Sequence, residues 1–350
     1  MTQTRSKRSN LLLQALEPSA RVVVITHDTP DPDAIAGGWA LHTLIRERLK
    51  RPVRLIGGGA VVRAENVHMI KMLEPPIELV DEYTPESDCA VVLVDCSAEA
   101  ANHLLGDGAV RPVAVIDHHE PTGKSVPVSF RDVRPRAAAA ATMSAGYLRE
   151  QGIEPTKQLA TALLYAVRTE ALNRQSPFTR ADRGVVGWLS KRADHQALSE
   201  IEHAPLPRTY YEEMMLALGS TFLYGNTAIC FLPHAGNPEI VGEFADLLIR
   251  CTDTERVLCG AVVHDQLTIS ARTSAIGGDV LRLLRPTLKG LGHWGGHRNR
   301  AGGRIIASGE GGAITQQLLD EVKARWLHAC GVTETRGTRL VTKRDVLDLF

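Results

Sequence analysis

Residues 22–33 read Val22-Val23-Val24-Ile25-Thr26-His27-Asp28-Thr29-Pro30-Asp31-Pro32-Asp33, and this stretch decides the fold. Its first four residues are apolar and β-branched. Such a run, with no polar alternation, predicts a strand covered on both faces, as parallel strands usually are. Pro30 and Pro32 keep the next segment extended, and Asp33 can cap a helix that begins near Ala34.

The end of this predicted strand carries His27, Asp31 and Asp33. Open α/β sheets bind their ligands at the carboxyl ends of their strands. A polar turn with a helix cap would account for Asp33 and Asp28. It would not account for a histidine and further acids between prolines, because like charges so close together repel unless a cation lies among them.

Two more apolar runs end in the same way. They are Cys89–Val94, followed by Asp95, and Val113–Ile116, followed by Asp117-His118-His119. A strand-ending aspartate often caps a helix, so one instance would carry little weight. Three strand ends that together supply three histidines and several acids predict a convergent metal site at one edge of a sheet.

Helical patterns at 34–50, 137–151, 158–167 and 182–189 alternate with these strands. The alternation predicts an α/β domain over residues 1–190, built on a doubly wound, mostly parallel sheet. Residues 191–215 are polar and are predicted to connect it to a second domain. Short strands and helices over 216–335, with a hairpin around 264–266, predict a smaller α/β domain. Residues 336–350 form a tail to which the sequence assigns no role.

Composition limits the classes of function. Forty basic and 40 acidic residues give a formal net charge of zero, whereas proteins that bind long nucleic acids usually have a basic excess. We therefore expect no long duplex partner. Six cysteines without CxxC spacing, and no signal peptide, indicate reduced thiols in a cytoplasmic protein. Leu11–Leu13 is too short an apolar run for a membrane span.

The pooled ligand types suit Mn²⁺, Mg²⁺, Fe²⁺ or Zn²⁺. More carboxylates are present than one Zn²⁺ needs, which favours two cations that share an acid. No cysteine is among the predicted ligands, which argues against structural zinc. Two cations roughly 3.5–4 Å apart can clamp the attacking and leaving oxygens of a phosphoryl displacement.

These residues also resemble the sequence motifs of a known protein family. Asp117-His118-His119 is the signature of the DHH phosphoesterase superfamily, and His27-x3-Asp31-Pro32-Asp33 resembles its first motif. Asp95 matches its second motif. Gly295-Gly296-His297 resembles the Gly-Gly-His motif of the associated C-terminal domain. The resemblance covers about residues 20 to 330, and it implies an active site in the cleft between the two domains.

The resemblance implies roles for the metal ligands. His27, Asp31 and Asp95 would hold one cation, and Asp33, Asp95 and His118 the other, with Asp95 bridging. The two cations are expected to be Mn²⁺, with Mg²⁺ as the alternative. His119 would contact the scissile phosphate or the leaving oxygen, and Asp117 would orient the histidines.

The chain departs from the family pattern at two positions. Glu170 stands in Thr169-Glu170-Ala171, where the family usually has aspartate. Its carboxylate could serve as a metal ligand from one methylene further out, or the ligand could be missing. Gly37 replaces a serine that is common after the first motif.

The second domain is predicted to bind the substrate. The candidate phosphate or base contacts are Arg272, Ser274, Gly295, Gly296, His297 and Arg298. Glycines let backbone N–H groups approach phosphate closely, and Arg272 offers a bidentate fork. For Arg298 and Arg300, a solvated loop explains the charges equally well.

The resemblance implies a hydrolase of short nucleotides, such as nanoRNA, dinucleotides or nucleoside bisphosphates. The alternatives are a cyclic-dinucleotide phosphodiesterase, a RecJ-type single-strand exonuclease, and a regulatory nucleotide-binding protein with a weakened DHH site. Zero net charge disfavours the exonuclease, which needs a long basic groove. The sequence leaves the oligomeric state open, including a homodimer.

Overall fold

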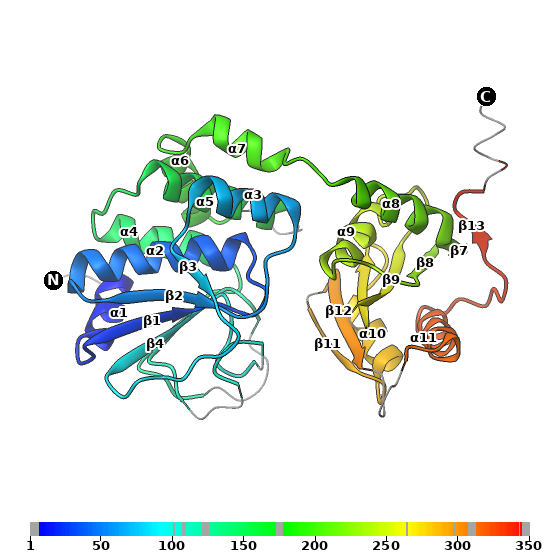
Figure 1. Cartoon of the computed structure of the whole chain (residues 1–350), viewed down its shortest axis with the longest axis horizontal. Coiled ribbons are helices and arrows are strands. Elements are labelled where there is room, and N and C mark those ends of the chain that lie inside the picture. Colours follow the sequence, from blue (N-terminus) through cyan, green and yellow to red (C-terminus); the bar gives the residue numbers. More distant parts are fainter. Residues whose placement is uncertain are drawn as a thin grey trace. The chain divides into compact units, whose positions relative to one another are not determined.

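The computed structural model describes residues 7–100, 102–106, 110–120, 126–172, 178–263, 265–296, 298–306, 313–342 and 344. It divides the chain into two compact units, Met1–Pro205 (unit 1) and Leu206–Phe350 (unit 2) (Figure 1). The division falls inside the segment 191–215, which the sequence assigns to a connector.

Unit 1 is built on a six-stranded, all-parallel sheet with the strand order β3-β2-β1-β4-β5-β6. The strands are β1 (Arg21–Ile25), β2 (Val53–Gly57), β3 (Ile77–Leu79), β4 (Cys89–Val94), β5 (Ala114–Asp117) and β6 (Phe130–Val133). The α/β fold class is therefore confirmed. The strand order reverses between β1 and β4, which are neighbours in the sheet.

The two faces of this sheet are covered differently. The helices are α1 (Arg8–Leu16), α2 (Pro32–Leu49), α3 (Ala64–Leu73), α4 (Ala140–Glu150), α5 (Lys157–Leu172), α6 (Arg180–Ser190) and α7 (His195–Glu202). Val22 and Val24 belong to the core shared with the helices, while Val23 and Ile25 pack with loop residues such as Leu104. Figure 1 shows α2, α4 and α5 above the sheet and loop segments below it.

Unit 2 contains a seven-stranded mixed sheet with the order β11-β12-β10-β9-β8-β7-β13. Its strands are β7 (Thr221–Tyr224), β8 (Thr227–Leu232), β9 (Arg256–Val263), β10 (Gln266–Thr273), β11 (His293–Gly296), β12 (Arg300–Ile306) and β13 (Thr338–Arg339). Strands β8 and β9 are parallel, and β9 and β10 form the predicted antiparallel hairpin.

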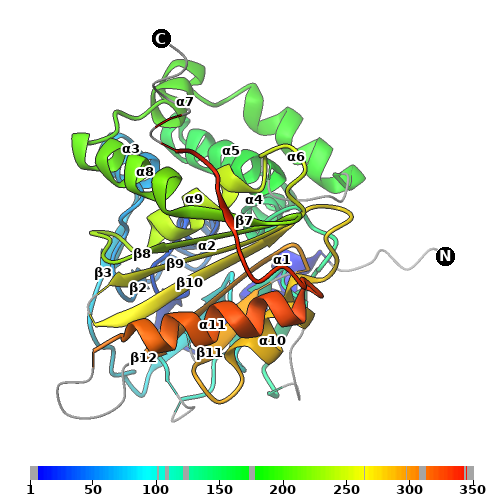
Figure 2. The same ribbon diagram turned by 90° about the vertical axis from the view of Figure 1, so that its right-hand side faces the viewer.

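Helices pack on both faces of the second sheet. They are α8 (Arg208–Ser220), α9 (Glu239–Leu248), α10 (Val280–Leu288) and α11 (Gln316–Ala329). Two separate cores result, because Phe244 of α9 lies in one cluster and Trp326 of α11 in the other. Figure 2 shows α8 and α9 on one side of the strands and α10 and α11 on the other.

The glycine-rich segment 290–303 differs from the predicted loop. Residues 293–296 form β11, which pairs antiparallel with β12. The glycines permit this close pairing, because a Cβ at Gly303 would collide with the backbone oxygen of His293 and a Cβ at Gly296 with that of Arg300. None of the helices in the described part of the chain is both long and apolar enough to cross a membrane.

Candidate metal centre

The predicted ligands of unit 1 gather at the carboxyl ends of β1, β4 and β5. Because β1 and β4 adjoin where the strand order reverses, their carboxyl ends open the crevice in which such sheets bind ligands. His27 follows β1, Asp95 follows β4, and Asp117 ends β5.

His27 is oriented by the backbone. Its Nδ1 lies 2.8 Å from the carbonyl oxygen of Asp28. A carbonyl only accepts, so Nδ1 donates and the neutral ring presents Nε2 as its lone-pair nitrogen. Nε2 lies 3.8 Å from Oδ1 of Asp31 and 3.6 Å from Oδ2 of Asp95.

The segment that carries His27 and Asp31 is held by neighbouring loops. The amide of Asp28 donates to the carbonyl of Asn102 (2.7 Å), and the amide of Thr29 donates to that of Gly58 (2.8 Å). Asp31 caps α2, since its Oδ1 accepts from the amides of Asp33 and Ala34. Nothing in the sequence pattern predicts the contribution of Asn102, which lies in a loop after β4.

Asp95 lies at the centre of the cluster. It is 3% exposed and has a positive φ of 59°, a conformation that non-glycine residues rarely adopt. Its Oδ1 lies 3.3 Å from Nε2 of His118 and 3.6 Å from Nδ1 of His119, and its Oδ2 faces His27. Oδ1 is buried without a hydrogen-bond partner in the described structure.

Asp33 joins α2 to α4 beneath the cluster. Its Oδ2 accepts from the amide of Ala140 (2.8 Å) and its Oδ1 from that of Ala141 (2.6 Å). Oδ2 also lies 3.3 Å from Nε2 of His118. Gly37 permits this approach, because a Cβ there would already stand 3.3 Å from the backbone nitrogen of Ala141.

His119 is held by Asp117. Its Nδ1 donates to Oδ1 of Asp117 at 2.7 Å, and its backbone amide donates to the same oxygen. Asp117 is buried, whereas the side chain of His119 is 38% exposed. The ring is thus fixed at the surface of the cluster.

Glu170 lies in the last turn of α5. Burial, followed by the negative charge of Asp31, raises its pKa to about 7. The charges of His118 and Asp95 also act on this pKa, so Glu170 lies within electrostatic range of the cluster. The structure does not include Glu170 in either of the two compact ligand groups, which are His27 with Asp31 and Asp95, and Asp95 with His118 and His119.

The pKa values of the histidines and acids in the cluster show that its carboxylates stabilise nearby positive charge. Burial alone would lower the pKa of His118, but the Asp95 carboxylate outweighs it and raises the pKa to about 10. The pKa of His27 is raised well above its usual range against the same opposing burial. Burial and the charge of Asp95 raise the pKa of Asp33. The same carboxylates would stabilise bound cations.

The contacts of His27 are too long for hydrogen bonds, and the ligand atoms lie close enough together to surround a cation. Contacts of 3.6 and 3.8 Å from His27 exceed hydrogen-bonding range. Two ligand atoms each about 2.1 Å from one ion lie roughly 3.0 Å apart at octahedral angles and roughly 3.4 Å apart at tetrahedral angles. Oδ1 of Asp95 has no hydrogen-bond partner in the described structure, and the donors are a mixture of imidazoles and carboxylates. Both features also suit a divalent cation.

The predicted contacts in unit 2 have varied surroundings. Arg272 is mostly buried and pairs with Asp246 (2.6 Å). The Ser274 hydroxyl is buried without a hydrogen-bond partner among the described residues. Gly295 and Gly296 are exposed on β11, and Arg298 is exposed. His297 lies outside the described residues.

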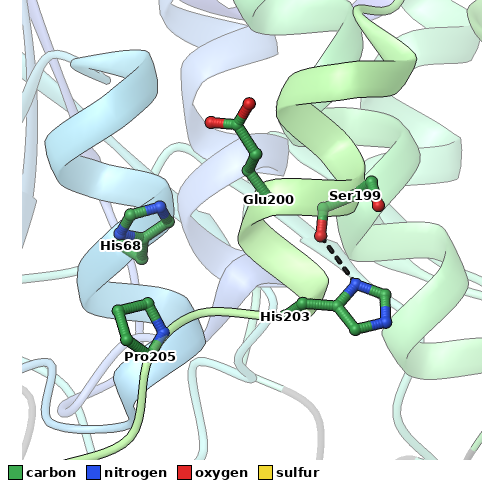
Figure 3. A pocket seen from close by; sticks show the side chains of 5 residues that line it. All are labelled: His68, Ser199, Glu200, His203 and Pro205. Carbon is green, nitrogen blue, oxygen red and sulfur yellow. Dashed lines mark hydrogen bonds between the residues drawn. The ribbon is translucent and has the colours of Figure 1, made fainter.

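A surface depression in unit 1 lies between α3 and α7 (Figure 3). Its lining is His68, Ser199, Glu200, His203 and Pro205. None of the clustered ligands lines it, so this depression and the candidate metal centre are separate features.

Comparisons with known proteins find a family model, a relative and solved structures that are similar to this chain. Residues 21–167 match the family model described as the N-terminal domain of the DHH family. An uncharacterized protein of Methanocaldococcus jannaschii is 27% identical over 324 residues, which are 91% of this chain and 66% of that protein. The chain therefore spans just under two thirds of this relative.

Two solved structures share the fold over nearly the whole chain. An exopolyphosphatase-related protein from Bacteroides fragilis gives a TM-score of 0.72 at 15% identity, covering 95% of this chain and 99% of its own. Exonuclease RecJ bound to manganese gives a TM-score of 0.53 at 18% identity, covering 97% of both chains.

Proposed function

From the premise that residues 21–167 form a DHH-family domain, we propose that this protein is a metal-dependent phosphoesterase that hydrolyses short nucleotides. DHH superfamily members are phosphoesterases. The observation that carries the proposal is that both compact ligand groups contain Asp95. A carboxylate shared between two groups is the arrangement that a two-cation phosphoesterase needs.

His27, Asp31 and Asp95, which form the first compact group, would hold one cation. Asp33, Asp95 and His118 would hold the other: Asp95 and His118 belong to the second compact group, and Oδ2 of Asp33 lies 3.3 Å from Nε2 of His118. When bound, the cations supply positive charge that stabilises the phosphoryl group and activates water as the nucleophile. Mn²⁺ is the first choice, since a protein of the same fold binds manganese, and Mg²⁺ is the alternative.

His119 would act on the leaving oxygen. Burial lowers its pKa, but the Asp117 carboxylate outweighs burial and the net shift is upward. A doubly protonated ring keeps Nδ1–H on Asp117 and directs Nε2–H away from it. His119 can then donate that proton to the departing oxygen, while Asp117 fixes the ring.

The substrate class follows from charge and size. A formal net charge of zero gives little attraction for a long phosphate backbone. Substrates of roughly two to five nucleotides, or nucleoside bisphosphates, need only a few contacts outside the cations.

The test is an activity screen of purified protein loaded with Mn²⁺. The panel holds dinucleotides, short oligonucleotides, a nucleoside bisphosphate, cyclic dinucleotides and a long single strand. Release of mononucleotide or phosphate from the short substrates, and its loss in EDTA, is the expected result. Metal binding without release from any substrate would instead indicate a regulatory nucleotide-binding protein.

A further inference from the structure

The first turn of α4 is capped by another helix. Helix α4 begins at Ala140, and its N-cap residue is Ala139, whose side chain cannot accept a hydrogen bond. The amides of Ala140 and Ala141 instead donate to the carboxylate of Asp33 on α2. The orientation of this proposed metal ligand therefore depends on where α4 begins.

Asp182 of α6 holds the segment just before that turn. Its Oδ1 accepts a hydrogen bond from the amide of Ala138 (3.1 Å), which is 44 positions away in the sequence. Both residues are buried. Since a buried amide needs an acceptor, this bond helps to fix the backbone two residues before Ala140.

The same segment is also attached to the strand that leads into the two histidines. The amide of Arg134 donates to the carbonyl of Asp117 at the end of β5 (2.8 Å), and the amide of Ala137 donates to the carbonyl of Arg134 (2.8 Å). Residues 134–141 thus run from the end of β5 to Asp33. Asp182 holds them between these two attachments.

The two oxygens of Asp182 have different partners. Oδ2 accepts from the amide (2.7 Å) and the hydroxyl (2.6 Å) of Thr179, which closes the capping box of α6. Oδ1 makes the bond to Ala138. A helix cap explains the first set of contacts and not the second. A capping box usually has Glu or Gln at this position, so the cap alone does not call for aspartate.

We propose that Asp182 is a positioning residue of the candidate metal centre. Acting through Ala138 and the first turn of α4, it holds Asp33 where Oδ2 of Asp33 lies 3.3 Å from Nε2 of His118. The presence of cations rests on the proposed function. The inference goes beyond it, because it assigns a role in cation binding to α6, which supplies none of the proposed ligands.

The test measures Mn²⁺ binding and stability separately, on the full chain freed of metal. Asp182→Ala should lower the Mn²⁺ affinity measured by calorimetry about tenfold, as is typical when a residue that supports a metal ligand is removed. The loss should fall on one of the two cations, because Asp33 would hold only one. Urea unfolding without metal measures the separate effect of the lost cap.

Thr179→Val is the matched control. It removes the hydroxyl of the same capping box and leaves the bond between Asp182 and Ala138 in place. It should lower the free energy of unfolding without metal and keep the Mn²⁺ affinity of wild type.

Asp182→Glu provides a second variant in case Asp182→Ala does not fold. Glutamate keeps the charge and the capping box, but its carboxylate lies one methylene further from the backbone and cannot hold Ala138 in the same place. This variant should therefore fold and still bind Mn²⁺ more weakly than wild type.

Three results would overturn the role of Asp182. The first is wild-type Mn²⁺ affinity in folded Asp182→Ala or Asp182→Glu. The second is an equal loss of affinity in Thr179→Val, which would mean that only the stability of α6 matters. The third is no Mn²⁺ binding by wild type, which would also contradict the proposed function. Mn²⁺ binding that depends on Asp182, in a protein that hydrolyses no phosphoester, would support this role and contradict the proposed function alone.

Discussion

Asp95 combines the charge and the backbone conformation that the candidate metal centre depends on. Within the described structure it belongs to both ligand groups. Its positive φ turns the chain sharply after β4, so that the carboxylate faces His27 on one side and His118 on the other. Asparagine and aspartate tolerate this conformation better than other non-glycine residues, so the charge can be removed without altering the turn.

Asp95→Asn should therefore keep the fold and abolish turnover. Loss of a shared ligand should cost on the order of 1000-fold in rate, or about 4 kcal/mol. Initial rates with Mn²⁺, metal stoichiometry and circular dichroism are the measurements. Asp253→Asn is the control, because Asp253 also has a positive φ (64°) and lies in unit 2. Near wild-type turnover by folded Asp95→Asn would refute the site assignment.

Glu170 can be tested by shortening and by removal. If it is a working ligand, Glu170→Ala should weaken Mn²⁺ binding about tenfold or more and lower the rate, because a half-buried carboxylate within electrostatic range of the cluster would be lost. Glu170→Asp should keep or raise both. The measurements are the Mn²⁺ affinity and the hydrolysis rate of both variants. If Glu170→Ala changes neither, Glu170 is not a metal ligand.

The clustering of the strand-end residues could be predicted from sequence, because apolar runs that end in acids and histidines specify both strand and position. Asp246 could not, because it lies on a different element from its partners. It is 26 residues from Arg272 and 54 from Arg300. No periodicity in the sequence encodes such a contact. The sequence therefore predicts Arg272 as a substrate contact, whereas its side chain is mostly buried against Asp246.

At the level of elements, long apolar runs predicted β1, β4, β5 and the main helices correctly. Strand β3 escaped prediction because it has three residues, two of them exposed. Strand β6 carries Arg131 and Asp132, which looks unlike a buried strand. Asp132 is nevertheless buried, and it accepts from Arg8, Arg134 and Tyr147. Such compensation becomes visible only in three dimensions.

The close packing of α2 on the start of α4 predicts the effect of a substitution at Gly37. Gly37→Val should push α4 away, weaken the hold of Ala140 and Ala141 on Asp33, and cost about 1–3 kcal/mol of unfolding free energy. It should also weaken Mn²⁺ binding. Urea unfolding and metal titration measure the two effects.

Gly146→Val is its control, since Gly146 lies in α4 with open space at its Cβ position. It makes the same chemical change in a helix without a backbone neighbour to displace. Equal stability and equal Mn²⁺ affinity in the two variants would show that the close approach at Gly37 does not support the centre.

At the level of the whole molecule, charge balance predicts substrate length. The hydrolysis rate, expressed per oligonucleotide end, should be highest for substrates of roughly two to five nucleotides. The reason is that the protein has no net positive charge to attract a long strand along its surface. Rates for oligonucleotides of increasing length at fixed salt provide the measurement. A rate that keeps rising to tens of nucleotides would favour a RecJ-type exonuclease.

The candidate metal centre draws its ligands from segments that meet only when β1, β4 and β5 have paired. An unfolded chain offers no such site, so the free energy of cation binding adds to the free energy of unfolding. At about 100 times its Kd, a cation contributes about 2.7 kcal/mol, a large share of the roughly 5–15 kcal/mol typical of a domain. A shortage of the cations would then remove the activity and also shorten the lifetime of the protein, because more of the chain would be unfolded and open to proteolysis.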